Sequence, residues 1–160
     1  MALHRTRSSD RLCLEFPVSP MQLWETLVVR TSDWWPREAH SSPRTRRFVL
    51  EPCVGGRAYE DFGDGQGILW FSVVGLESGQ RLQLAGMLAP PRGGPSLISL
   101  HLRVEPRPAG ASALSIEDER FGIPGTDPLE ACLRSVFERG LRRHLDWRSV
   151  PRPLGRSRTA

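Results

Sequence analysis

Hydrophobic and polar residues alternate through several short stretches of the sequence, with the period of two that marks a half-buried strand. The pattern is clearest at residues 97–105, where Ile98 and Val104 bound the apolar set and His101 belongs to the polar face. Glycine and proline turns separate this stretch from others of the same kind. We predict further strands at residues 11–16, 47–51, 57–62, 68–76, 81–87 and 113–121. Strands at this spacing are typical of an antiparallel meander.

Two segments show instead the three- and four-residue spacing of a helix that is apolar on one side. The first follows Ser19, Pro20 and Gln22, which are a hydroxyl cap, a first-turn proline and a capping-box residue. The second begins at the cap residue Asp127 and ends before Pro151. Its apolar stripe consists of Leu129, Leu133, Val136, Phe137, Leu141 and Leu145. The sequence therefore predicts a short helix after the first strand and a long C-terminal helix.

The predicted order is one strand, one or two short helices, six strands and a long helix. Because all six later strands precede the long helix, one antiparallel sheet curved around that helix is the arrangement that buries its apolar stripe. We therefore predict an α+β fold with a curved sheet of six to seven strands wrapped around the C-terminal helix. The domain spans residues 10–147, with a flexible N-terminus at 1–9 and a basic disordered tail at 148–160.

The charge of the chain bears on the partners that it can have. The chain carries 22 basic residues, all of them arginine, and 18 acidic residues. Four of the arginines lie in residues 148–160, so residues 1–147 hold the remaining 18 against the same 18 acids. A formally neutral domain lacks the basic face that nucleic-acid binding needs, so we expect no nucleic-acid partner. The absence of lysine excludes Schiff-base chemistry and a phosphate-binding P-loop.

The cysteines and the N-terminus indicate where the protein works. Among 160 residues there are three widely spaced cysteines, Cys13, Cys53 and Cys132, and no Cys-x-x-Cys pair. This usage argues against a disulfide framework and against a cysteine zinc site. The first ten residues lack the apolar stretch of a secretory signal, and no apolar run in the sequence is long enough to span a membrane. We therefore expect a cytoplasmic protein with no membrane partner.

Four stretches along the chain together resemble a known superfamily. They are VSPMQLW at residues 18–24, WWP at 34–36, LEPCVGGR at 50–57 and GQGILW at 65–70. In order and spacing they are similar to the START-like (SRPBCC) helix-grip superfamily, and most of all to the branch of the activator of heat-shock-protein-ninety ATPase. The resemblance covers residues 10–147. It implies a deep hydrophobic cavity between the long helix and the concave sheet, which members use for lipids, hormones and polyketides.

Two positions depart from what members of this superfamily commonly have. Members carry a tryptophan near the end of the strand that matches residues 81–87, where this chain has Ala85 and Gly86. They carry another after the glycine of the long helix, where Leu141 follows Gly140 here. The smaller side chains predict a cavity at least as roomy as usual, provided that no other residue fills it.

Asp118 and Arg120 are the polar residues best suited to a ligand in such a cavity. They share a strand face with Leu114 and Ile116, so they lie at the cavity wall if that face is the concave one. In that position they would orient the polar end of a ligand, or act as an acid and an electrostatic clamp. The alternative interpretation is a strand-end ion pair exposed to solvent.

Aromatic and aliphatic residues complete the predicted ligand-binding set. Trp34 and Trp35 precede Pro36 in a loop, and they form either an aromatic rim over the cavity mouth or part of the core. Trp70 lies in a stretch that is apolar on both faces, so the sequence does not assign its side. The other candidates are Leu84, Leu100, Leu102, Ile116, Phe137 and Leu141.

The sequence contains no catalytic motif, so we assign no catalytic residue, no metal ligand and no cofactor. The four histidines lack the spacing of metal ligands. The leading hypothesis is a non-catalytic binder of a small apolar molecule. The alternatives are a cyclase- or hydratase-type enzyme that uses Asp118 and Arg120, and a regulator of a chaperone ATPase. A homodimer formed through an uncovered sheet edge also fits the sequence, although no particular residue argues for it.

Overall fold

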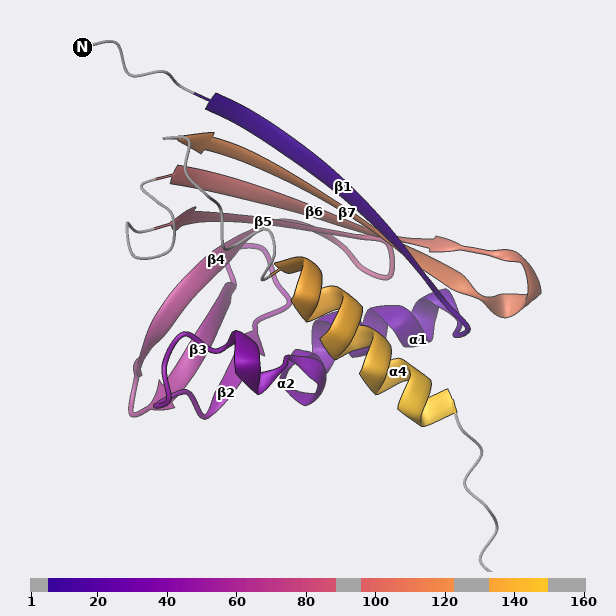
Figure 1. The fold of residues 1–160 in the computed structure, drawn as a ribbon, viewed down its shortest axis with the longest axis horizontal. Helices are drawn as coiled ribbons and strands as arrows, with labels where there is room; N and C mark the ends of the chain where they lie inside the picture. The colour runs from indigo at the N-terminus through magenta and orange to yellow at the C-terminus, as the bar shows by residue number, and fades with distance from the viewer. Residues whose placement is uncertain (1–5, 89–95, 123–132, 150–160) are drawn as a thin grey trace, which may run out of the picture.

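Seven antiparallel strands form one curved sheet in the part of the chain that the structure describes (Figure 1). The computed structural model describes residues 6–88, 96–122 and 133–149. The strands are β1 (Thr6–Phe16), β2 (Arg47–Leu50), β3 (Arg57–Gly63), β4 (Gln66–Glu77), β5 (Arg81–Leu88), β6 (Ser96–Pro106) and β7 (Ser112–Gly122). Their order across the sheet is β1-β7-β6-β5-β4-β3-β2, so β2 to β7 form the predicted meander and β1 pairs with β7. The predicted α+β fold is confirmed.

Strand β1 begins at Thr6, five residues before the predicted start. It pairs with β7 along its whole length, from Thr6 opposite Gly122 to Phe16 opposite Ser112. Residues 6–10 are all polar, so no alternation of apolar and polar residues could reveal that they continue the strand. Their extended conformation follows from backbone pairing with β7 rather than from their own sequence.

The segment after β1 contains short helical turns in series: α1 (Pro20–Trp24), the π-helical turn η1 (Glu25–Val29), α2 (Thr31–Trp34) and the 3₁₀ turn η2 (Arg37–Ala39). The predicted cap is present, since Ser19 Oγ accepts a hydrogen bond from the backbone nitrogen of Gln22 at 3.2 Å. Leu23 and Trp24 point into the core. This segment places Trp34 and Trp35 beside the C-terminal helix.

The C-terminal helix is described from residue 133 onwards. It consists of one helical turn at residues 133–135, the π-helical segment η5 (Val136–Leu141) and α4 (Arg142–Ser149). Figure 1 shows it lying within the curve of the sheet, under the long strands. Its predicted start at Asp127 and residues 150–160 of the predicted tail lie outside the described residues. Among the described helices, none is long and apolar enough to cross a membrane.

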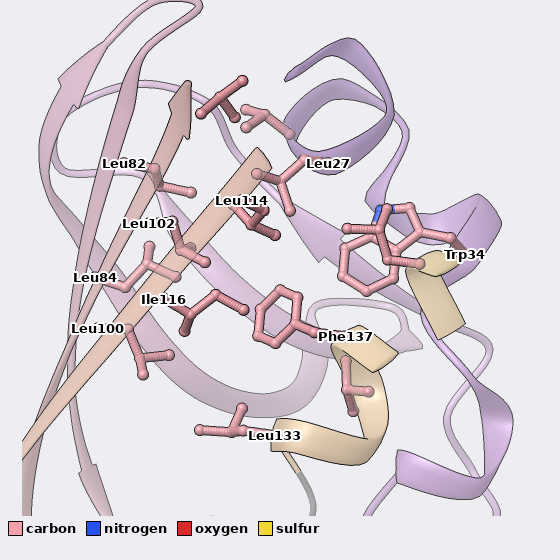
Figure 2. Packing of buried hydrophobic residues seen from close by; sticks show 14 of the residues in the cluster. Leu27, Trp34, Leu82, Leu84, Leu100, Leu102, Leu114, Ile116, Leu133 and Phe137 are labelled. Carbon is pink, nitrogen blue, oxygen red and sulfur yellow. The ribbon is translucent and has the colours of Figure 1, made fainter. Parts of the chain in front are cut away.

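The concave face of the sheet and the inner face of the helix form the core (Figure 2). Strands β5, β6 and β7 contribute alternate aliphatic residues, and the helix contributes Leu133, Val136, Phe137, Leu141 and Leu145. These five helix residues belong to the predicted stripe, and all of them are buried. Because the sheet curves around the helix, one continuous cluster buries the apolar surface of both.

Candidate functional site

Asp118 and Arg120 form an ion pair on the concave face of β7, directed toward the C-terminal helix. Nε of Arg120 lies 2.9 Å from Oδ2 of Asp118, and their side chains are 7 % and 14 % exposed. Both side chains therefore face the interior of the fold, beside Leu133 and Phe137 of the helix, and not the solvent. Charged groups are seldom buried to this extent unless they are paired, which accounts for the close contact between the two.

The ion pair borders a small pocket, which we call the ion-pair pocket. Its volume is about 30 Å³, and its other lining residues are Leu12, Leu100, Ile116, Leu133, Arg134 and Phe137. The pocket thus combines one charged pair with a mainly apolar wall. Such a combination is typical of sites that bury an apolar body and orient one polar group.

A second pocket of about 30 Å³, the apolar pocket, lies deeper between the helix and the sheet. The lining residues include Trp34, Trp35, Phe48, Leu84, Leu102 and Leu27. Leu100, Leu133 and Phe137 line both pockets. These three side chains therefore form the partition between the ion pair and the apolar interior.

Aromatic rings occupy much of the space between the helix and strands β2 to β4. The indole of Trp35 stacks on the ring of Phe48, with ring centroids 3.6 Å apart and planes 4° apart. Trp70 meets both rings edge-on, at centroid distances of 5.7 Å to Trp35 and 5.9 Å to Phe48. The structure thus assigns the side of Trp70, which the sequence left open: it faces the core and is buried.

The carboxylate of Glu60 holds Trp70 in this position, although no pattern in the sequence singled this residue out. Glu60 is fully buried, and Nε1 of Trp70 donates a hydrogen bond to it at 2.9 Å. It also accepts hydrogen bonds from the backbone nitrogen of Ser41 at 2.8 Å and from the hydroxyls of Ser41 and Thr45. Burial acts to raise the pKa of Glu60, but these hydrogen bonds outweigh it and keep the pKa below its usual value.

The small residues at positions 85 and 86 predicted a roomy cavity, but the described part of the chain does not have one beside them. A Cβ on Gly86 would lie 2.2 Å from the carbonyl oxygen of Trp70 and 2.8 Å from Cδ1 of Phe71. Gly86 therefore accommodates the Trp70–Phe71 segment of β4, where the pairing with β3 is irregular, instead of leaving free space. Other residues thus fill the space that the small side chains would have left open.

Gly140 has a similar role on the helix. A Cβ at this position would lie 2.7 Å from the carbonyl oxygen of Trp34 and 2.8 Å from Cδ of Pro36. The glycine lets η5 approach the turn after α2, and Leu141 beside it is fully buried. The small residue at this point is thus used for close packing between two segments.

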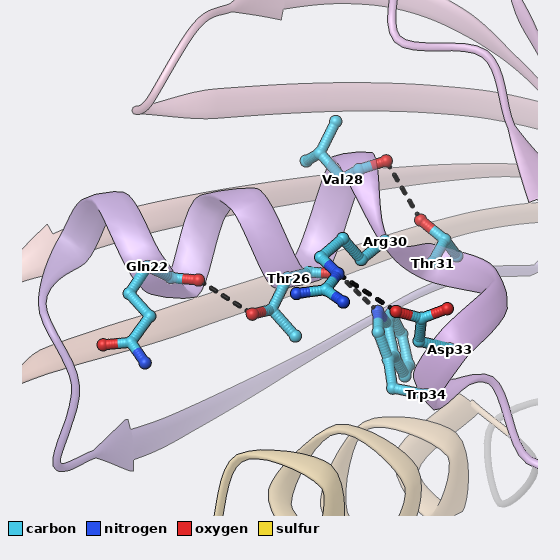
Figure 3. A network of polar contacts seen from close by, with 7 residues as sticks. All are labelled: Gln22, Thr26, Val28, Arg30, Thr31, Asp33 and Trp34. Carbon is cyan, nitrogen blue, oxygen red and sulfur yellow. Dashed lines mark hydrogen bonds and ion pairs between the residues drawn. The ribbon is translucent and has the colours of Figure 1, made fainter. Parts of the chain in front are cut away.

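Hydrogen bonds fix the segment that carries the two tryptophans (Figure 3). Nε1 of Trp34 donates to the carbonyl oxygen of Thr26 at 2.8 Å, and Trp34 is buried. The hydroxyl of Thr31 donates to the carbonyl oxygens of Leu27 and Val28. Trp34 is therefore part of the core, as the second interpretation of this residue predicted.

Trp35 is only partly buried and also borders the outer surface. Together with Trp34 it lines the apolar pocket on one side and a groove of about 670 Å³ on the other. We call this the outer groove, and its other lining residues are Asp33, Pro36, Glu38, Ala39, Ser135, Arg139, Gly140, Arg143 and His144.

The structure brings most of the predicted ligand-binding residues to the interior. Leu84 and Leu102 line the apolar pocket, Ile116 lines the ion-pair pocket, and Leu100 and Phe137 line both. Trp70 and Leu141 are buried in the same core cluster without lining either pocket. Phe48 and Leu12 also line these pockets but were not among the predicted residues, because the alternation of a strand does not distinguish a pocket-lining residue from any other core residue.

The described residues contain no cluster of His, Cys, Asp or Glu side chains that could hold a metal ion. His101 lies on the polar face of β6, as predicted, with its ring nitrogens 3.1 Å from Nε2 of Gln83 and 3.0 Å from Oγ of Ser99. Cys13 and Cys53 are exposed free thiols.

No family model and no curated protein matches the sequence. Solved structures do match. Ara h 8.0201 superposes with a TM-score of 0.64 at 12% identity, covering 89% of this chain and 99% of that one. Protein CV1439 from Chromobacterium violaceum gives 0.59 at 21% identity, covering 86% of this chain and 96% of that one. The chain has the helix-grip, START-like fold.

A further match places this fold in a longer protein. DynU16, a protein in the dynemicin biosynthetic locus, superposes with a TM-score of 0.54 at 22% identity. The match covers 86% of this chain but 47% of DynU16. At these identities the likenesses establish the helix-grip architecture alone.

Proposed function

We propose that this protein binds a small hydrophobic molecule, of lipid or polyketide type, between the C-terminal helix and the sheet, without catalysis. The observation that carries the proposal is the buried Asp118–Arg120 pair at the edge of an otherwise apolar helix-grip interior. The pair would bind the polar end of the ligand, and the aliphatic residues of β5 and β6 would contact its apolar body.

Binding requires the interior to open, because each of its two pockets holds about 30 Å³. Ordinary ligand sites have roughly 300–1,000 Å³. The partition residues Leu133 and Phe137 both belong to the C-terminal helix, so a shift of this helix or a rotation of Phe137 joins the two pockets. In this proposal the closed state described above is the empty state, and the ligand selects an open one.

The neutral fluorophore N-phenyl-1-naphthylamine tests the proposal, since its fluorescence rises in apolar surroundings. We expect saturable binding that strengthens in Phe137→Ala, which removes the partition, and weakens in Leu100→Phe, which fills both pockets. Phe62→Ala, on β3 outside both pockets, is the matched control for Phe137→Ala. The proposal fails if binding is absent in all variants, or if it is indifferent to Phe137 and Leu100.

A second candidate function is an enzyme of the cyclase or hydratase type that uses Asp118 and Arg120. This function requires both side chains to face the interior. The observation that favours it is that both do so and are largely buried. Asp118 would act as the acid, and Arg120 as the electrostatic clamp on a substrate oxygen. A compound that co-purifies with Asp118→Asn but is converted by the wild-type protein would establish this function, whereas recovery of the same unaltered compound from both proteins would exclude it.

The sequence resemblance alone supports a further alternative, regulation of a chaperone ATPase in the manner of the branch named above. Stimulation of the ATPase by the purified protein would support it, and an unchanged rate would exclude it.

We also propose a cytoplasmic location, on the basis of the sparse cysteines. Persistence of the free thiols of Cys13 and Cys53 in protein isolated from cells would agree with a reducing compartment.

A further inference from the structure

The outer groove is a second concave site, separate from the interior. It lies between the C-terminal helix and the turns that follow η1, where Figure 1 shows α2 beside the helix. Its volume of about 670 Å³ falls within the usual range for small-molecule sites, roughly 300–1,000 Å³. Trp34 and Trp35 separate it from the apolar pocket, because both residues line both spaces.

The part of the groove contributed by the turns is apolar and fixed in shape. Trp35, Pro36 and Ala39 contribute ring and methyl surfaces to it. The stacking of Trp35 on Phe48 and the close approach of Gly140 to the carbonyl oxygen of Trp34 keep this wall in place. A rigid surface of aromatic and proline rings favours a flat ligand, since ring stacking on it needs little reorganisation.

The helix side of the groove is cationic. Arg139 and Arg143 lie four residues apart on the helix, so both reach the same groove wall. Both side chains are exposed, and neither forms an ion pair with another described residue. On the opposite side, Asp33 is neutralised by Arg30, whose Nε lies 3.0 Å from Oδ2 of Asp33.

We propose that the outer groove binds a planar aromatic molecule that carries an anionic group, such as a carboxylate, sulfonate or phosphate. The ring lies along Trp35 and Pro36, and the anion binds Arg139 and Arg143. Glu38 also lines the groove and is exposed, so it repels the anion from the turn side and directs it toward the helix. This site goes beyond the proposed interior function and does not depend on it.

Two fluorophores of nearly the same shape test the proposal. 1-Anilinonaphthalene-8-sulfonate carries an anionic group, and N-phenyl-1-naphthylamine is its uncharged counterpart. In the double variant Arg139→Gln/Arg143→Gln we expect the Kd for the sulfonate to rise about tenfold, because two exposed ion pairs contribute about that much to the affinity. The Kd for the neutral probe should not change. Glu38→Gln should lower the Kd for the sulfonate severalfold, because it removes a repulsive charge.

The control double variant, Arg103→Gln/Arg142→Gln, removes the same charge from surfaces outside the groove. It should bind the sulfonate as the wild-type protein does. The proposal is overturned if the groove double variant stays within twofold of the wild type, or if the control variant weakens binding equally. It is also overturned if Leu100→Phe abolishes binding of the sulfonate, since the probe then occupies the interior.

Discussion

The indole nitrogen of Trp70 donates a hydrogen bond to the fully buried carboxylate of Glu60, 2.9 Å away. Trp70 comes from β4 and Glu60 from β3, while Ser41 and Thr45, which also donate to this carboxylate, lie in the segment before β2. One charged group thus joins two neighbouring strands to the segment between η2 and β2. The same contact directs the indole against Trp35 and fills space that would otherwise belong to the interior.

We predict that Glu60→Ala is among the more destabilising single substitutions in the protein. It removes the acceptor of the buried indole nitrogen of Trp70 and of the half-buried donors of Ser41 and Thr45, and losing hydrogen bonds to a buried charged group costs about 1–3 kcal/mol each. The expected loss in the free energy of unfolding is about 3 kcal/mol or more, measured by urea denaturation. The exposed carboxylate of Glu77 provides the control, since Glu77→Ala should change stability by less than about 0.5 kcal/mol. A loss for Glu60→Ala no larger than that of the control would contradict this role.

The same carboxylate should make stability depend on pH. Because the pKa of Glu60 is lower in the folded protein than its ordinary value of 4.5, the unfolded chain binds the proton more readily. The stabilisation is therefore fully present above that ordinary value and is lost as the pH falls through the lowered folded pKa. Urea midpoints measured from pH 7 downward should fall more steeply in the wild-type protein than in Glu60→Gln. Parallel profiles would show that Glu60 does not contribute.

Breaking the buried ion pair from one side should be costly. Asp118→Ala removes the carboxylate next to a guanidinium that is only 7 % exposed, and we expect a loss of about 3 kcal/mol. The double variant Asp118→Ala/Arg120→Ala should lose less than the sum of the two single variants, because either single change already removes the contact between the two side chains. The exposed pair of Glu77 and Arg81 should show almost no such coupling. Additive losses at Asp118 and Arg120 would indicate that the two do not interact energetically.

Gly140→Ala should destabilise the protein even though alanine is the better helix former. In an exposed helix the change would gain about 1 kcal/mol. Here the new methyl group would lie 2.7 Å from the carbonyl oxygen of Trp34, so we expect a net loss of about 1–3 kcal/mol by thermal or urea unfolding. Arg139→Ala, one residue earlier and exposed, should leave stability nearly unchanged. A stabilised Gly140→Ala variant would show that the helix has room to move away from the turn.

The sequence predicted the architecture because its strongest signals are local and repeated. The alternation in β6 and the stripe from Leu133 to Leu145 each indicate a buried face without knowledge of the partner. The same logic placed Asp118 and Arg120 on the face of Leu114 and Ile116, where the structure has them.

The interior could not be predicted in the same way, because its shape depends on contacts between segments far apart in the sequence. Glu60 sits in a short strand, and its donors lie up to 19 residues away, so no local pattern singles it out. The small residue Gly86 indicated free space, but the irregular β3–β4 pairing brings Trp70 and Phe71 over it. The outer groove likewise arises where Gly140 meets the turn after α2, a contact that residue spacing does not encode.

Native mass spectrometry of the purified protein tests the central claim most directly, followed by denaturation and identification of any released small molecule. The account predicts a non-covalent apolar adduct that is absent from Leu100→Phe, which fills the interior, and retained in Arg139→Gln/Arg143→Gln, which alters the outer groove alone. An adduct that survives Leu100→Phe, or a protein that stays empty when a panel of lipids and polyketides is added, would contradict it.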